Sequence, residues 1–137
     1  MLTGETTYRT IYADTDQMGV VYYGNYGKFY EMGRSEMVRE LGFAYKQLED
    51  LGYFMPVSEV KAKYHKSLFY DEVIRIKTTL KELPKVRMVF HHEIYNSQDE
   101  LVHTAEVTLV FLSAESNRPV RVPAELLKSL TNVAVWR

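Results

Sequence analysis

Two aspartates lie one residue apart near the start of this sequence, in a polar stretch that leads into apolar and aromatic residues. Asp14 and Asp16 flank a threonine, and the stretch continues to Tyr26. Directly after it, apolar side chains recur every three or four residues, which predicts a helix. The start of a helix offers free backbone N–H groups and a partial positive charge. A carboxylate held beside such a start suits a substrate with a polarised carbonyl group.

The predicted helix begins near Gly24 or Asn25 and ends near Gly42. Asparagine is a residue type that caps helix starts. Capping alone would explain Asn25 at this position, and a substrate contact is the alternative role. Gly33 lies on the apolar face, where a glycine costs about 1 kcal/mol relative to alanine. We therefore expect the helix to approach another backbone very closely at that point. The apolar face has these members: Tyr26, Phe29, Tyr30, Gly33, Met37 and Leu41.

Alternating apolar and polar residues predict strands elsewhere in the chain. The first strand covers Thr6 to Tyr12, and four long strands follow residue 54, at about 60–64, 74–80, 86–95 and 101–111. We expect each to have one core face and to join the next through short turns at 83–85 and 96–99, in an antiparallel meander. Two shorter helical pieces are predicted, over 43–51 and from about Ala124 to Leu130, with Pro123 at the entrance of the second.

This order of elements favours an α+β fold in which a five-stranded antiparallel sheet wraps around one long helix. We expect residues 1–137 to form one domain. The edge of such a sheet and the second face of the helix stay partly bare in a single chain. We therefore expect the protein to associate with itself, at least as a homodimer.

The composition excludes several kinds of protein. A net charge of −1 gives no general attraction to nucleic acid or to an anionic membrane. The absence of cysteine excludes disulfides, thiolate metal sites and a cysteine nucleophile, and it suits a cytoplasmic protein. We see no signal peptide at the N-terminus and no apolar run long enough to cross a membrane.

The acidic stretch resembles the motif of the hot-dog-fold acyl-CoA thioesterases, and more narrowly the 4-hydroxybenzoyl-CoA thioesterase group, which includes the thioesterase encoded beside the Tol-Pal genes. That motif reads aromatic-x-Asp-x-Asp-x-x-Gly-hydrophobic-Val-aromatic-x-x-x-Tyr, and it matches Tyr12 to Tyr26 here, with Glu31 and Arg34 following. Several fixed spacings make this match far more specific than a lone Asp-x-Asp. The strand order and the segment Arg118–Pro123 also fit, so the resemblance covers nearly the whole chain.

The resemblance implies hydrolysis of a thioester to a carboxylate and free coenzyme A, without a cofactor. By motif position, Asp16 is the catalytic aspartate, and the backbone N–H of Tyr23 polarises the thioester carbonyl. Relatives of the Tol-Pal type often have histidine at position 23, which bears on substrate choice because a backbone donor needs no particular side chain. They commonly have proline at position 67, where this chain has Ser67. Asp16 could attack the thioester directly or act as a general base on water, and Asp14 is expected to support the loop.

Other candidate residues surround this pair. Gly24, Asn25, Tyr26 and Glu31 are expected to bind substrate, although Glu31 and Arg34 could instead form an ion pair on the helix. The phosphates of coenzyme A need cations, and the resemblance favours the turn with Lys85 and Arg87 and the segment from Arg118 to Arg121. A solvated basic surface is the alternative reading of each cation. The full set of candidate cations is Lys61, Lys63, Lys66, Lys85, Arg87, Arg118 and Arg121.

Four histidines, His65, His91, His92 and His103, fall on predicted strands at spacings that do not converge, so no metal site is expected. No nucleophile elbow supports a serine–histidine–acid triad. Three alternatives to an acyl-CoA thioesterase stay open: action on an acyl-carrier-protein thioester, action on an aromatic acyl-CoA such as a hydroxynaphthoyl one, and a non-catalytic acyl-binding protein of the same fold. A hot-dog dehydratase is disfavoured, because such enzymes resemble one another in a catalytic histidine and none lies in the acidic stretch.

Overall fold

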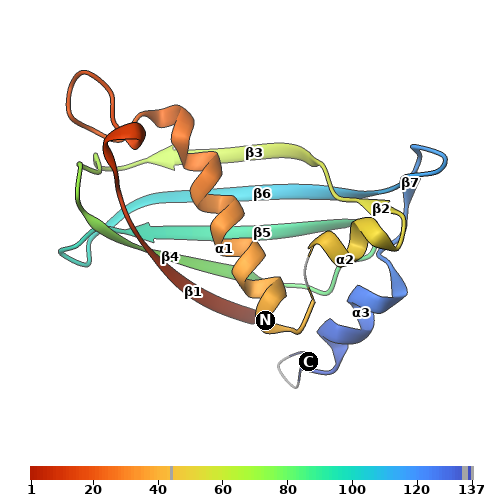
Figure 1. Ribbon diagram of the computed structural model, residues 1–137. Coiled ribbons are helices and arrows are strands. Elements are labelled where there is room, and N and C mark those ends of the chain that lie inside the picture. The colour runs from red at the N-terminus through yellow and green to blue at the C-terminus, as the bar shows by residue number, and fades with distance from the viewer. Residues whose placement is uncertain (44, 134–135, 137) are drawn as a thin grey trace.

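A computed structural model of the chain describes residues 1–43, 45–133 and 136. Within these residues, three helices and seven strands follow one another (Figure 1). Their bounds are β1 Leu2–Arg9, α1 Tyr26–Glu40, α2 Tyr45–Asp50, β2 Tyr53–Phe54, β3 Val57–Tyr64, β4 Val73–Leu80, β5 Arg87–Tyr95, β6 Leu101–Ser113, β7 Pro119–Val120 and α3 Ala124–Thr131. Single 3₁₀ turns cover Tyr12–Asp14 and Tyr23–Asn25.

The sheet is antiparallel, and its long strands lie in the order β1, β4, β5, β6, β3. The expected meander is confirmed for β4, β5 and β6. It is wrong for β3, which pairs with β6 and not with its successor β4. The physical reason is that β1 occupies the other edge of β4 along its full length, from Leu2 opposite Leu80 to Arg9 opposite Val73. The segment 65–72 therefore carries the chain from one side of the sheet to the other.

Helix α1 lies across one face of the curved sheet, as Figure 1 shows, and packs on β1, β4 and β5. Its buried residues are Tyr26, Phe29, Tyr30, Gly33, Met37 and Val38. The predicted apolar face is thus confirmed over most of its length. The close approach at Gly33 is also confirmed, because a Cβ atom there would collide with the Thr78 hydroxyl and lie 3.1 Å from Ile76 Cγ2.

Strand β3 departs from the expectation that every strand has one core face. All eight of its residues are exposed, including Val60 and Tyr64. Helix α1 packs mainly against the opposite half of the sheet. Its first residue, Tyr26, contacts the ring of Tyr64 at the end of β3, while Val60 stays 49% exposed. The alternation along β3 therefore marks an apolar surface that the described residues leave largely exposed.

Element boundaries shift where local hydrogen bonds override residue preference. The first strand starts at Leu2 and ends at Arg9, because Thr10 turns away to bond Phe69 and Glu72. The helical piece expected over 43–51 is found as Tyr45–Asp50, with residue 44 outside the described part. The last helix agrees with its expected start after Pro123. No described helix is both long and apolar enough to cross a membrane.

Candidate active site

The acidic loop is a tight turn that presents Asp16 to solvent. The Asp16 N–H donates to the Val20 carbonyl at 2.9 Å, and the Gly19 N–H donates to the Asp16 carbonyl at 3.1 Å. Gly19 has a φ of +78°, in the left-handed region that glycine adopts without strain. One carboxylate oxygen of Asp16 accepts the Met18 N–H at 2.8 Å. The turn thus orients the Asp16 carboxylate while leaving its side chain exposed.

The start of α1 lies beside this turn. The Tyr22 N–H donates to the Asp14 carbonyl at 2.9 Å, and the 3₁₀ turn Tyr23–Asn25 then continues into the helix. No acceptor is recorded among the described residues for the N–H groups of Tyr23 or Gly24, as is usual for the first donors of a helix. These two groups are therefore free to bind an oxyanion.

Asp16 and the helix start line one cavity of about 340 Å³. Of the predicted site residues, the structure brings Asp16, Tyr23 and Tyr26 to this cavity, and Gly24 and Asn25 belong to the same turn. Tyr64, His65 and Lys66 also line the cavity. The sequence indicated Lys66 as one of seven candidate cations, but it did not assign Tyr64 or His65 to the site. Tyr64 is the last residue of β3 and the other two follow it, and only the strand order places this end of β3 beside Asp16.

Asp14 has a different environment from Asp16. Its side chain is buried and forms an ion pair with Lys28. It also accepts the Tyr8 hydroxyl at 2.8 Å and the Ile11 N–H at 2.9 Å. Burial alone would raise the pKa of Asp14, but the hydrogen bonds from Lys28, Ile11 and Tyr8 outweigh it and hold the pKa below its usual value. The expectation that Asp14 supports the loop agrees with these contacts.

Asn25 is not the helix cap that its residue type suggested. It occupies the residue before α1, but its side chain makes no capping bond. The Nδ2 atom donates instead to the Asp14 carbonyl at 2.7 Å. The physical reason is the preceding 3₁₀ turn, which already places Asn25 in a helical conformation. Asn25 therefore ties the helix start to the acidic loop.

Glu31 does not line the Asp16 cavity. With Arg34 it lines a separate cavity of about 170 Å³, which also includes Tyr45, Tyr53 and Leu109. No ion pair between Glu31 and Arg34 is recorded in the part of the chain that the structure describes. The Tyr45 hydroxyl is buried there, next to Arg34.

Lys85, Arg87 and Arg118 lie away from Asp16 within one chain. Lys85 and Arg87 line a cavity of about 430 Å³ at the β4–β5 turn. The bridge between Val20 and Phe69 places the acidic loop near the opposite end of β4. Eight residues of strand separate the two ends, which corresponds to about 25 Å. Arg118 is exposed just before β7, and its carbonyl accepts the Ser113 N–H at the end of β6, the end that pairs with Arg87. Figure 1 shows β7 at this end of the sheet.

Comparison with known proteins identifies the family. Residues 12–130 match the family model of the thioesterase-like superfamily. The chain belongs to this superfamily. It is 34% identical over 110 residues to the putative acyl-CoA thioesterase YneP of Bacillus subtilis, covering 80% of each chain. It is 33% identical over 136 residues to the acyl-CoA thioesterase YbgC of Helicobacter pylori, covering 90% of this chain and 96% of that one.

Solved structures agree with this assignment. The 1,4-dihydroxy-2-naphthoyl-CoA (DHNA-CoA) thioesterase of Staphylococcus aureus superposes with a TM-score of 0.90 at 31% identity, covering 96% of this chain and 91% of that chain. The two expectations drawn from the acidic motif, the hot-dog fold and membership of the acyl-CoA thioesterase family, are confirmed.

Two histidines meet in the core of this thioesterase-like domain, against the expectation that no histidines converge. The rings of His92 and His103 stack on Tyr30, with centroids 5.2 and 5.6 Å away. The Tyr30 hydroxyl hydrogen-bonds His103 Nε2, and Thr78 Oγ1 lies 3.0 Å from His92 Nδ1. Burial lowers the pKa of His92 to about 3, with help from the Arg34 charge, and lowers that of His103 to about 4.

His103 also packs against two tyrosines of the candidate site. Its ring lies 4.4 Å from that of Tyr26 and 4.6 Å from that of Tyr64, and both tyrosines line the Asp16 cavity. The Tyr64 hydroxyl donates to the Tyr23 carbonyl at 3.3 Å. No group of three or more histidine or carboxylate side chains in the described residues is arranged to hold a metal ion.

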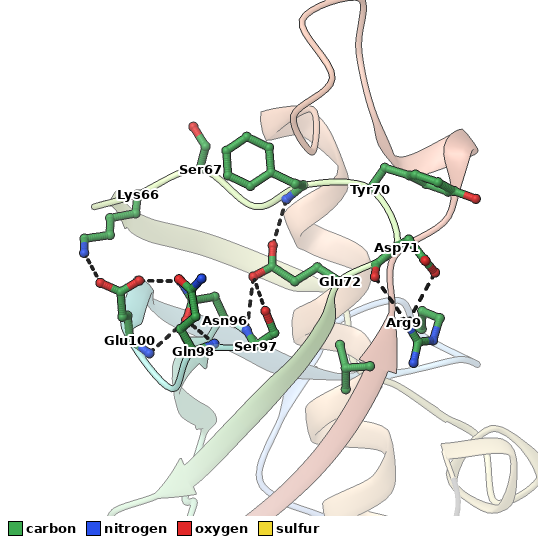
Figure 2. A pocket seen from close by; sticks show the side chains of 12 residues that line it. Arg9, Lys66, Ser67, Tyr70, Asp71, Glu72, Asn96, Ser97, Gln98 and Glu100 are labelled. Carbon is green, nitrogen blue, oxygen red and sulfur yellow. Dashed lines mark hydrogen bonds and ion pairs between the residues drawn. The ribbon is translucent and has the colours of Figure 1, made fainter.

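A broader cavity of about 870 Å³ adjoins the candidate site of this thioesterase-like protein and shares Lys66 and Ser67 with it. Figure 2 shows that its charged side chains pair with one another. Arg9 contacts Asp71, Lys66 contacts Glu100, and Glu72 accepts bonds from Ser97 and from the Phe69 N–H. Both cations that line this cavity, Arg9 and Lys66, are thus paired with carboxylates, so its described lining offers no unpaired cation for phosphates.

Proposed function

We propose that this protein hydrolyses acyl-CoA thioesters to a free acid and coenzyme A at the cavity that contains Asp16. The observation that carries the proposal is the juxtaposition of an exposed, oriented carboxylate and a helix start in one cavity of about 340 Å³. The similarity to the putative acyl-CoA thioesterase YneP of B. subtilis and to the acyl-CoA thioesterase YbgC of H. pylori supports the substrate class. The cysteine-free sequence agrees with a cytoplasmic location, which stays a prediction.

Asp16 can act in two ways. In the first, a carboxylate oxygen attacks the thioester carbon, the C–S bond breaks, the thiolate leaves, and water hydrolyses the resulting anhydride. In the second, Asp16 accepts a proton from a water molecule whose oxygen attacks the same carbon. Both routes pass through an oxyanion, which the N–H groups of Tyr23 and Gly24 would stabilise. Such a donor is often worth about 3–4 kcal/mol.

The central experiment measures thiol release from short, long and aromatic acyl-CoAs, and from acyl-carrier-protein thioesters. We expect wild-type protein to release thiol and Asp16→Asn to lose at least about 100-fold in kcat. Asp50→Asn is the matched control, because Asp50 is an exposed aspartate in α2. No thiol from any substrate would contradict the proposed function, and an active Asp16→Asn would contradict the site.

A covalent intermediate separates the two routes. If Asp16 is the nucleophile, rapid quenching during turnover of a slow substrate should leave an acyl group on the peptide that contains Asp16, detectable by mass spectrometry. If Asp16 is a general base, no acylated peptide forms while thiol release stays dependent on Asp16.

We further propose that two chains assemble through β3, as a homodimer or within a homotetramer. One edge of β3 has no partner strand among the described residues, and its face exposes Val60 and Tyr64. Pairing of two such edges would satisfy the unpaired backbone groups of both and would bring the exposed side chains of the two β3 strands side by side. It would also let Lys85, Arg87 or Arg118 of one chain bind the phosphates of a substrate held at Asp16 of the other, whereas within one chain these cations lie about 25 Å from the acidic loop.

An aromatic acyl-CoA is the second candidate substrate, favoured by the cavity lined by Glu31. Its volume of about 170 Å³ is close to that of a cavity that holds one benzene ring. Glu31 lies about 10 Å along the helix axis from Gly24, which is within reach of a ring on an acyl group held there. Glu31→Gln should then lower kcat/KM for hydroxylated aromatic substrates more than for straight-chain ones.

A further inference from the structure

A lysine in the first turn of α1 is unexpected from helix electrostatics. Helix starts carry a partial positive charge and favour acidic side chains, yet the first turn of α1 has no acid and contains Lys28. Lys28 does not line the Asp16 cavity. Its position therefore needs an explanation outside the helix.

The contacts of Lys28 supply that explanation. Its ammonium group forms the ion pair with the buried carboxylate of Asp14 and lies 3.4 Å from the Tyr8 hydroxyl. It also lies over the rings of Tyr8 and Phe29, 5.2 and 5.7 Å from their centroids. The side chain of Lys28 is 39% exposed and that of Asp14 only 1%. Lys28 is thus the cationic partner that lets Asp14 stay buried and charged.

Asp14 in turn connects three parts of the site. Its carboxylate binds β1 through Tyr8 and the helix through Lys28. Its carbonyl accepts the Tyr22 N–H and the Asn25 side chain, which flank the free donors of Tyr23 and Gly24. Asp16 follows two residues later in the same chain segment. A shift of Asp14 would therefore displace both the Asp16 carboxylate and the start of α1.

We propose that Lys28 is a positioning residue that, through Asp14, sets the distance between the Asp16 carboxylate and the N–H groups at the start of α1. The inference rests on the proposed function, because that distance matters only if both groups act on one carbonyl. A displacement of about 1 Å can lower a rate about 100-fold when reacting groups must be aligned.

Steady-state kinetics of Lys28→Met test the proposal. Methionine keeps the length and packing of the side chain and removes the charge. We expect kcat to fall about 10- to 100-fold, with KM changed less than about threefold, because Lys28 does not touch the cavity. Lys28→Arg should recover most of kcat, since arginine also pairs with a carboxylate. Lys77→Met is the control: Lys77 forms an ion pair with Glu93 at similar exposure, 37%, on β4.

A purely structural role is separated by a double-mutant cycle and by amide exchange. If Lys28 acts through Asp14, Asp14→Asn with Lys28→Met should reduce kcat no further than the worse single variant. Hydrogen exchange of the Asp16 and Tyr22 amides should accelerate in Lys28→Met, while the amides of β5 and β6 stay unchanged. If Lys28→Met does not fold, Asp14→Asn and Lys28→Arg carry the same comparison.

Two results would overturn the inference: an unchanged kcat in folded Lys28→Met, or multiplicative losses in the double variant. A wild-type protein without thioesterase activity would contradict the proposed function instead. In that case amide exchange still tests whether Lys28 holds the acidic loop against the helix. If the Asp16 and Tyr22 amides exchanged in Lys28→Met at the same rate as in the wild type, that role of Lys28 would be excluded.

Discussion

The hydroxyl group of Thr78 on β4 occupies the space that a Cβ atom on Gly33 of α1 would need. His92 Nδ1 lies 3.3 Å from the same point and hydrogen-bonds that hydroxyl. The helix therefore lies as close to the sheet as a backbone without a side chain allows. Gly33 therefore determines how closely α1 packs on the sheet, and with it the position of the helix start that lines the Asp16 cavity.

Gly33→Ala should lower the free energy of unfolding by about 1–3 kcal/mol, because the helix must move away from Thr78. Gly27→Ala is the control on the same helix. A Cβ atom there meets nothing within 4 Å, so helix propensity alone should raise stability by about 1 kcal/mol. Urea unfolding measures both changes. Equal effects of the two alanines would contradict the close approach.

The buried histidines predict that stability decreases on acidification. His92 and His103 stay neutral in the folded protein down to about pH 3 and about pH 4, whereas in the unfolded chain they protonate near pH 6.5. Their contribution is fully present above about pH 6.5 and is lost as the pH falls toward the folded values. Two such groups give a slope of up to about 2.7 kcal/mol per pH unit.

Urea unfolding between pH 6 and pH 5 measures this slope. His103→Gln removes one of the two groups, so its slope should be about half that of the wild type. A wild-type stability that does not change over this range would show that these side chains are accessible to protons in the folded state.

Amide substitution of the two aspartates of the motif should affect stability to different extents. Asp14→Asn removes a buried charge from its lysine partner and should lower the free energy of unfolding by about 1–3 kcal/mol, a value reduced for the partial exposure of Lys28. Asp16→Asn should leave stability within about 0.5 kcal/mol, since its side chain is exposed. Asp71→Asn is the surface control, because its pair with Arg9 is about 60% exposed on both sides and should matter little. Thermal unfolding at neutral pH compares all three.

The lowered pKa of Asp14 adds a pH signature to this prediction. Its stabilising effect is present above the usual aspartate pKa and is lost as the pH falls through the lower value of the folded protein. The difference between wild type and Asp14→Asn should therefore shrink below about pH 4.

Strand β3 predicts how self-association can be disrupted. Val60 is 49% exposed on the uncovered face, and Val60→Lys would place a charge in an interface formed there. We expect the mass measured by light scattering to fall toward that of one chain, 16.0 kDa. Val73→Lys is the control, because Val73 is 38% exposed on β4, which lies on the other half of the sheet. Loss of assembly in both variants would argue against β3 as the interface.

Features that depend on neighbouring residues could be predicted from the sequence. The period of Tyr26, Phe29 and Tyr30 determined the buried face of α1, and the turns at 83–85 and 96–99 determined the β4–β5–β6 meander. The spacing of Asp14 and Asp16 within the motif was enough to indicate the family. These patterns extend over only a few residues, so they can be recognised in the sequence without knowledge of the fold.

The tertiary structure decided which elements lie side by side. The alternation of residues along β3 predicts its two faces but not the strand with which it pairs. It pairs with β6 because β1 occupies the edge of β4. Only that pairing brings Tyr64, His65 and Lys66 to Asp16. The same holds for His92 and His103, which meet Tyr30 because β5 and β6 pair in one particular register.

The different environments of Asp14 and Asp16 show this division most clearly. The sequence by itself determined that two carboxylates lie before a helix, since that is a matter of spacing. Which one is buried was decided by Tyr8 of β1 and Lys28 of α1, which reach Asp14 from both sides. The physical reason is that burial of a charge requires partners from other elements, and the order of residues does not specify where those elements meet.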